Sequence, residues 1–195
     1  MSDTIYSYEA PFLRAALGQI KDFLLSKEIF WNLGLKSPKG HPPYPQLSLG
    51  NALLSFERLL ALKKTGLLSK PQMLDIDEIA LMLESLKNEW TSAWEAKVKN
   101  EYGLRLRQWA RFVNEMSKSS QPEAGSFSSG LRNRAVMQTI KSDLPNEGTA
   151  LLSEVASLDQ HFKQLSKGTD FVWEKELKLH FSPDEYWFLY TQANN

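Results

Sequence analysis

Residues 100–113, NEYGLRLRQWARFV, hold three arginines, a tryptophan and a tyrosine in a short stretch. Cations beside aromatic rings could bind phosphates and stack on bases. At 100° per residue, however, Arg107 and Arg111 lie opposite the stripe that contains Tyr102 and Trp109, as on a solvated helix face. Base stacking would need the rings on the same exposed side as the arginines. The spacing therefore favours a structural helix over a nucleic-acid surface.

Nucleic-acid or anion binding stays open as an alternative interpretation. Arg132 and Arg134 follow a serine-rich stretch and could fold back beside Arg107 and Arg111. A patch of this kind would bind phosphates in a salt-dependent way.

The charge is unevenly distributed, although the 195 residues sum to a net charge of zero. Residues 95–141 carry nine basic and four acidic side chains, and residues 142–195 carry four basic and nine acidic ones. This gradient fits either a basic patch for an anionic partner or an internal match between the two parts. The internal match is favoured because nucleic-acid-binding domains tend to be basic overall.

The residue types that catalyse reactions or hold metals do not form a recognisable motif. There are no cysteines, and none of the three histidines has a partner at helical metal-ligand spacing. Asp75, Asp77 and Glu78 suit a helix N-terminus, where negative charge is favourable. The sequence therefore predicts no metal site, no cofactor and no catalytic residues, and it favours a non-enzymatic protein.

The aromatic residues give two further sets of candidates. Trp94, Tyr102 and Trp109 fit apolar helical stripes, and together with Glu101 they could line a pocket between helices. Seven aromatic residues crowd into 171–190, more than a short terminal segment can bury by itself. Candidates for partner binding in that segment are Trp173, Phe181 and Trp187.

Helical periodicity predicts a mainly α protein, an irregular bundle of about six to seven helices around one long central segment, 75–117. The apolar residues of that segment form two faces rotated by roughly 100° from each other, so we expect two packing neighbours or a break, with Gly103 as the obvious place. An earlier helix is expected to start after Ser48, which would cap its N-terminus, and to end at Gly66. Further helices are expected at 9–31, 131–143, 147–166 and 183–192.

The domain prediction is an N-terminal helical body at 1–117, a flexible serine-rich linker at 118–130 and a C-terminal helical part at 131–195, packed as one compact unit. Residues 171–181 alternate like a short strand, but no convincing partner strand is apparent, so a helix is preferred. No apolar run approaches the ~18 residues that span a bilayer, and no export signal is visible, so a cytoplasmic location without a membrane partner is expected.

The leading prediction is a non-enzymatic cytoplasmic interaction or scaffold protein that binds a protein partner or assembles with itself. The first alternative is a nucleic-acid-associated helical protein that uses the basic residues. The second is a small-molecule binder or enzyme with a pocket between helices.

Overall fold

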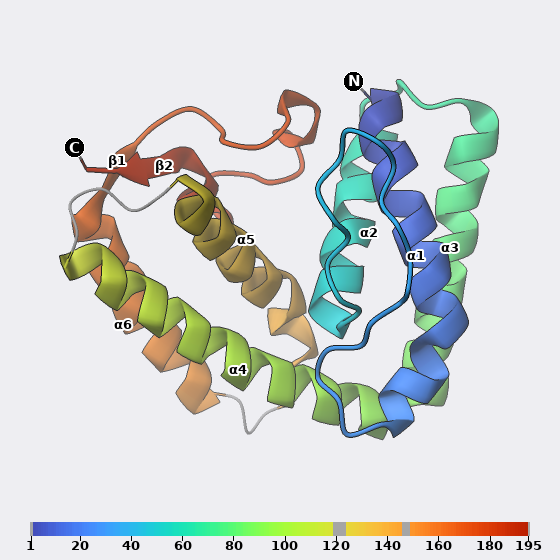
Figure 1. Ribbon diagram of the computed structural model, residues 1–195, viewed down its shortest axis with the longest axis horizontal. Coiled ribbons are helices and arrows are strands. Elements are labelled where there is room, and N and C mark those ends of the chain that lie inside the picture. Colours follow the sequence, from blue (N-terminus) through green and yellow to red (C-terminus); the bar gives the residue numbers. More distant parts are fainter. Residues whose placement is uncertain (1, 119–123, 146–148, 195) are drawn as a thin grey trace. The chain divides into compact units, whose positions relative to one another are not determined.

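The computed structural model describes residues 2–118, 124–145 and 149–194, and it confirms the mainly α prediction (Figure 1). The described residues form six α-helices and one short two-stranded sheet. The helices are α1 (Ser2–Leu25), α2 (Leu49–Lys64), α3 (Lys70–Glu89), α4 (Thr91–Lys118), α5 (Ala124–Ile140) and α6 (Thr149–Leu165). In this part of the chain, no helix is both long enough and apolar enough to cross a bilayer.

Contacts divide the chain into two compact units, Met1–Val98 (unit 1) and Lys99–Asn195 (unit 2). The division falls inside α4, whereas the sequence suggested a boundary at 118–130. Residues 124–130 belong to α5, so the linker prediction is wrong for them, and 119–123 lie outside the described residues. Serine and glycine are weak helix formers, but Phe127 packs against Phe112 and Phe162, and such tertiary contacts override propensity.

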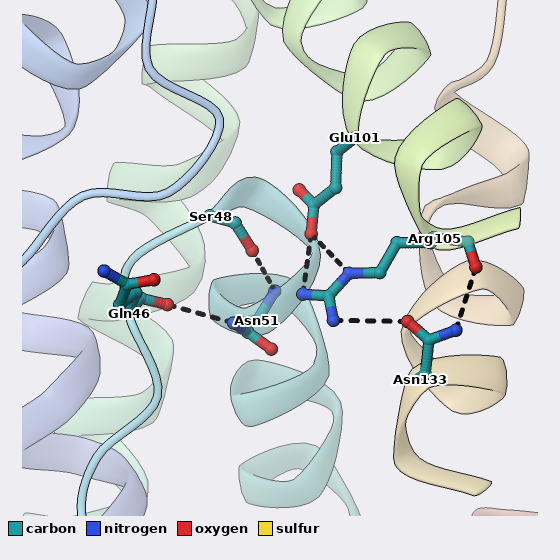
Figure 2. A network of polar contacts seen from close by, with 6 residues as sticks. All are labelled: Gln46, Ser48, Asn51, Glu101, Arg105 and Asn133. Carbon is teal, nitrogen blue, oxygen red and sulfur yellow. Dashed lines mark hydrogen bonds and ion pairs between the residues drawn. The ribbon is translucent and has the colours of Figure 1, made fainter. Parts of the chain in front are cut away.

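Unit 1 is built from α1, α2 and α3, which pack on one another through a common apolar core. The predicted cap of α2 is confirmed: the Ser48 hydroxyl accepts a hydrogen bond from the Asn51 backbone N–H at 3.1 Å (Figure 2). The Asn51 side chain donates to the Gln46 carbonyl at 2.9 Å and fixes the entry to the helix. Gly66 follows the end of α2 and has a φ of 71°. Glycine suits this position because it adopts the left-handed conformation without strain.

The predicted single segment 75–117 is two helices, and the break lies at Trp90 instead of Gly103. Trp90 has a φ of −119° and a ψ of 33°, outside the helical region, while Gly103 lies inside α4. The rotation between the two apolar faces is thus produced by a change of helix. Helix α3 also begins earlier than the predicted start at 75. It starts at Lys70, where the Ser69 backbone N–H donates to the Gln72 side chain at 2.9 Å.

Unit 2 combines the remainder of α4 with α5, α6 and the sheet. Strand β1 (Ser166–Gly168) pairs antiparallel with β2 (Thr191–Ala193), with Lys167 opposite Gln192. The interior is rich in aromatic rings, and Trp109, Phe162, Phe181 and Phe188 are fully buried.

The C-terminal segment differs from both structures considered for it. Residues 171–181 form neither a strand nor an α-helix; they contain only a 3-10 turn, Lys175–Leu177. The predicted terminal helix at 183–192 is also wrong, since this stretch contains a second 3-10 turn, Trp187–Tyr190, and then β2. The physical reason is that backbone N–H groups of Thr169 and Val172 donate to the carbonyls of Tyr190 and Leu189, at 2.9 and 3.0 Å. These long-range hydrogen bonds replace the local ones of a helix.

Candidate functional site

The four arginines proposed for anion binding lie in different environments. Arg107 and Arg111 are exposed on α4, where Arg111 pairs with Glu115 at 2.8 Å. Arg132 is half-buried on α5, and Arg134 is buried. The structure therefore does not present all four guanidinium groups on one exposed surface.

Arg134 belongs to a buried group that we call the Asp159 cluster, formed by Trp109, Arg134 and Asp159. The guanidinium binds both carboxylate oxygens of Asp159, with Nε–Oδ1 at 2.9 Å and Nη2–Oδ2 at 2.7 Å. Trp109 donates its indole N–H to Oδ1 at 3.1 Å, and Arg134 lies 4.8 Å from the centre of the Phe188 ring. This ion pair joins the basic part of the sequence, 95–141, to the acidic part, 142–195.

The pocket candidates Trp94, Glu101, Tyr102 and Trp109 are all buried. Glu101 accepts two hydrogen bonds from Arg105, which lies one helical turn further along α4, at 3.0 and 3.2 Å. Figure 2 shows that Arg105 is also linked to Asn133 of α5. The Arg105 guanidinium donates from Nη1 to the Asn133 Oδ1 at 3.3 Å, and the Asn133 Nδ2 donates to the Arg105 backbone carbonyl at 2.9 Å. The pair is therefore tied to the packing of α4 on α5.

Tyr102 is a buried group with a large shift in acidity. Burial raises the pKa of its hydroxyl to about 12; the negative charge of Asp159 adds to this effect and the positive charge of Arg134 opposes it. A phenol with this pKa stays neutral at physiological pH, so Tyr102 behaves as a core residue.

The C-terminal aromatic residues proposed for partner binding are largely used in packing. Phe181 is fully buried. Trp187 is half-buried against Phe162, with the Lys163 ammonium 4.4 Å from its ring centre. Trp173 stands edge-on to Phe181, at 5.3 Å between ring centres, and keeps part of its surface accessible.

Across 2–118, 124–145 and 149–194, no three His, Asp or Glu side chains lie close enough together to hold a metal ion. His41 stacks on the Tyr8 ring at 5.1 Å between centres, which accounts for its place in the proline-rich loop.

A feature that the sequence analysis did not identify is a groove between α1 and α3, inside unit 1. It has a volume of about 650 Å³, in the size range of ligand sites, and is open to solvent. We call it the α1/α3 groove. Its apolar lining comes from Leu17, Leu81, Met82 and Leu86.

Two of these side chains are unusually exposed. Leu81 is 68% exposed and Met82 is 40% exposed, whereas Ile76, Ile79 and Leu83 of the same helix are buried. The helix thus has a second apolar face that does not contribute to the core. The available signal in the sequence was Leu81, because it departs from the helical period of the core residues.

Gly18 forms part of the lining on α1. A Cβ atom built on Gly18 would meet no other atom within 4 Å, so no neighbour in the structure requires a glycine there. Glycine in a helix interior costs about 1 kcal/mol relative to alanine. Because Gly18 has no side chain and open space beside it, a ligand in the groove can approach the backbone of α1 closely.

Charged residues surround this apolar surface. Arg14 of α1 pairs with Glu78 of α3 at 2.8 Å and also with Asp75, and Lys21 pairs with Glu89 at 3.2 Å. All these side chains except Asp75 are 45–63% exposed. Because Asp22, Glu78 and Glu89 line the groove together with one cation, Lys21, its charge is negative.

Comparison of the chain with protein-family models, curated protein sequences and solved structures gave no match.

Proposed function

We propose that this protein is a protein-binding module, and that the α1/α3 groove takes an amphipathic helix of a partner protein with basic residues beside its apolar stripe. The observation that carries the proposal is an exposed apolar groove, about 650 Å³ in volume, with an open wall at Gly18. Recognition of a helix in an apolar groove is a common mode of peptide binding.

The shape of the lining suits side chains of varied form. Met82 is unbranched and polarizable, so it can adapt to Leu, Met or Phe side chains of a bound helix. The absence of a side chain at Gly18 lets the backbone of a partner helix approach α1. Burial of Leu81 and Met82 by a partner would remove apolar surface from water at roughly 25 cal/mol per Å².

The negative charge of the groove selects among occupants. A second copy of this chain, bound through the same surface by a two-fold axis, would bring Asp22, Glu78 and Glu89 close to their own copies. A partner with lysine or arginine on the flanks of its apolar stripe would meet favourable charges instead. The exposed ion pairs at the rim contribute little to folding, so they can exchange partners at small cost.

Two fluorescein-labelled model helices test the proposal. Both have leucines at positions i, i+3, i+4 and i+7; one carries lysine and the other glutamate on the polar face. We expect saturable binding of the lysine peptide in fluorescence anisotropy, and at least tenfold weaker binding of the glutamate peptide. Equal binding of both peptides, or none, would overturn the proposal.

Matched variants locate the binding surface. Gly18→Leu fills the groove and Leu81→Asp puts a charge on its apolar wall, so each should weaken binding of the lysine peptide at least tenfold. Gly125→Leu is the control for the first, since Gly125 is also a helical glycine with nothing within 4 Å of an added Cβ. Leu67→Asp is the control for the second, because Leu67 is 62% exposed and does not line the groove. Loss of binding in the controls as well would contradict the assignment to the groove.

Two parallel measurements cover the other predicted partners. Steeply salt-dependent binding of random oligonucleotides that is lost when Arg107 and Arg111 are changed to alanine would favour the nucleic-acid alternative. Dimerisation that is lost with Gly18→Leu, measured by light scattering, would assign the groove to a second copy. The cytoplasmic location stays a prediction, which fractionation of cells that produce the tagged protein would test.

A further inference from the structure

Unit 2 has a pocket of its own, with a volume of about 370 Å³. It lies between the first turns of α5, residues 169–173 and strand β2. The apolar part of its lining comes from Phe127, Leu131, Val172, Trp173 and Ala193. Val172 is 42% exposed, so the pocket opens to solvent beside an apolar side chain that lacks full cover.

The polar part of the lining contains no charged side chain. It consists of three hydroxyl groups, on Ser128, Thr169 and Thr191, and the amide of Gln192. Thr191 donates its hydroxyl hydrogen to the Phe188 carbonyl at 2.7 Å. In the described ranges, the side chains of Ser128, Thr169 and Gln192 have no hydrogen-bond partner. The pocket therefore offers donors and acceptors that the fold does not use.

The walls are held in place by long-range contacts. Pairing of Gly168 with Thr191 and of Lys167 with Gln192 fixes β2, and the Thr169 backbone N–H continues the pairing by donating to the Tyr190 carbonyl. Trp173 is braced by Phe181 at 5.3 Å and by Phe171 at 6.4 Å between ring centres. A pocket with walls fixed in this way is largely pre-formed, which reduces the entropic cost of binding.

We propose that this pocket binds an uncharged small molecule with an aromatic ring and an amide or hydroxyl group. The ring would lie against Trp173 and Phe127, and its polar group would meet Thr169, Ser128 or Gln192. A charged ligand is disfavoured because the pocket has no counter-charge to offset the loss of hydration. A purely apolar ligand would leave the hydrogen-bonding groups of the lining without partners.

Three fluorinated probes that share one fluorinated ring test this specificity by ¹⁹F NMR on the full chain. They are 4-fluorobenzamide, which has the ring and a neutral amide, 4-fluorobenzoate, which replaces the amide with a charge, and fluorobenzene, which has no polar group. For a ligand of about ten non-hydrogen atoms we expect a dissociation constant of roughly 1 mM for the benzamide. The other two should bind about tenfold more weakly, since each lost buried hydrogen bond costs on the order of a factor of ten. Equal binding of the three probes, or no binding of the benzamide, would overturn the proposal.

A pair of neighbouring substitutions ties the binding to this pocket. Ser128→Trp places a large ring in the pocket, whereas Ser129→Trp adds the same ring to an exposed position of α5 that does not line it. We expect the first to abolish benzamide binding and the second to leave it unchanged. Thr169→Val keeps the shape of the side chain but removes its hydroxyl, so it should weaken the benzamide and leave fluorobenzene unaffected. Equal effects of both tryptophan variants would place the ligand elsewhere and refute the assignment.

Discussion

The α1/α3 groove and the Asp159 cluster both contain ion pairs between helices, but they differ in access to water. The side chains of Arg14 and Glu78 beside the groove are 45% and 63% exposed, while those of Arg134 and Asp159 are 7% and 12% exposed. The buried carboxylate also accepts a hydrogen bond from Trp109, so its hydrogen-bonding capacity is used inside the fold. Because water screens the exposed pair, it adds little to stability and remains available to a partner.

The same contrast extends to the glycines of the two regions. Gly18 has open space where a side chain would be, whereas a Cβ on Gly130 would lie 2.7 Å from the Phe112 ring. The first glycine keeps a surface open, and the second lets α5 pack closely on an aromatic side chain. Each difference between the regions can be tested by substitution.

The largest expected effect is the loss of the buried carboxylate. Asp159→Ala leaves the Arg134 guanidinium buried without its counter-charge, so we expect the free energy of unfolding to fall by about 3–5 kcal/mol. Glu78→Ala at the groove should change it by about 0.5 kcal/mol or less. Urea denaturation followed by tryptophan fluorescence measures both values. A similar loss in the two variants would contradict the distinction between the regions, and the double variant with Arg134→Met and Asp159→Leu should recover most of the stability.

The second prediction concerns the close contact at Gly130. Gly130→Ala introduces a methyl group that Phe112 must move to accommodate, so the free energy of unfolding should fall by about 1–3 kcal/mol. A shift of the urea midpoint would measure this loss. If the variant were as stable as the parent protein, the tight packing of α5 at this point would be wrong.

The third prediction is a dependence of stability on high pH. The pKa of Tyr102 is about 12 in the folded protein and about 10 in the unfolded chain. Between these values the unfolded chain releases the proton while the folded protein keeps it, so this stabilisation is complete below pH 10 and is lost as pH rises towards 12. We expect Tyr102→Phe to reduce this pH-dependent loss by on the order of 1–2 kcal/mol.

Tyr6, whose hydroxyl donates a hydrogen bond to Asp75, is the control when the free energy of unfolding is measured by urea denaturation across this pH range. Burial also raises the pKa of its hydroxyl, but the positive charge of Arg14 opposes the change. Tyr6→Phe should therefore alter the slope of stability against pH less than Tyr102→Phe does. The reverse order would show that Tyr102 is not the residue that titrates with the larger shift.

The smallest effect is expected at Gly18, and it has the opposite sign. Gly18→Ala relieves the helix of a flexible residue and meets no neighbour, so the free energy of unfolding should rise by about 0.5–1 kcal/mol. Differential scanning calorimetry should detect the increase as a higher Tm. A destabilised Gly18→Ala variant would mean that the α1 backbone at this point is more constrained than the open groove indicates.

Local signals in the sequence predicted the features that depend on nearby residues. Ser48 was recognised as a cap, because a cap acts over three residues. The Glu101–Arg105 pair is also local, since its members are four residues apart on one helix. The two apolar faces predicted for 75–117 followed from the period of the helix, and they include the buried residues Ile79 and Val113. The start of α3 at Lys70 was missed because two capping signals, Ser69 and Asp75, lie close together and only packing decides between them.

The candidate sites could not be predicted in the same way. Leu81 and Met82 are apolar residues like those of the core, and only the position of α1 shows that they line an open groove. The pocket of unit 2 depends on the pairing of residues 166–168 with 191–193, which are far apart in the sequence. The stretch 171–181 alternates like a strand, yet the Val172 backbone N–H donates to the Leu189 carbonyl and the Tyr190 hydroxyl donates to the Phe181 carbonyl, and these bonds hold it in an irregular form.

The sequence by itself determined the helical class of this protein, the apolar faces of its helices and the capped start of α2 at Ser48, because these follow from periods and spacings of a few residues. Only the tertiary structure decided that Arg134 is buried with Asp159, that Gly18 opens on a groove, and that Trp173 lines a pocket. Each of these outcomes depends on which distant segment packs against the residue, and burial and access to water are set by that packing.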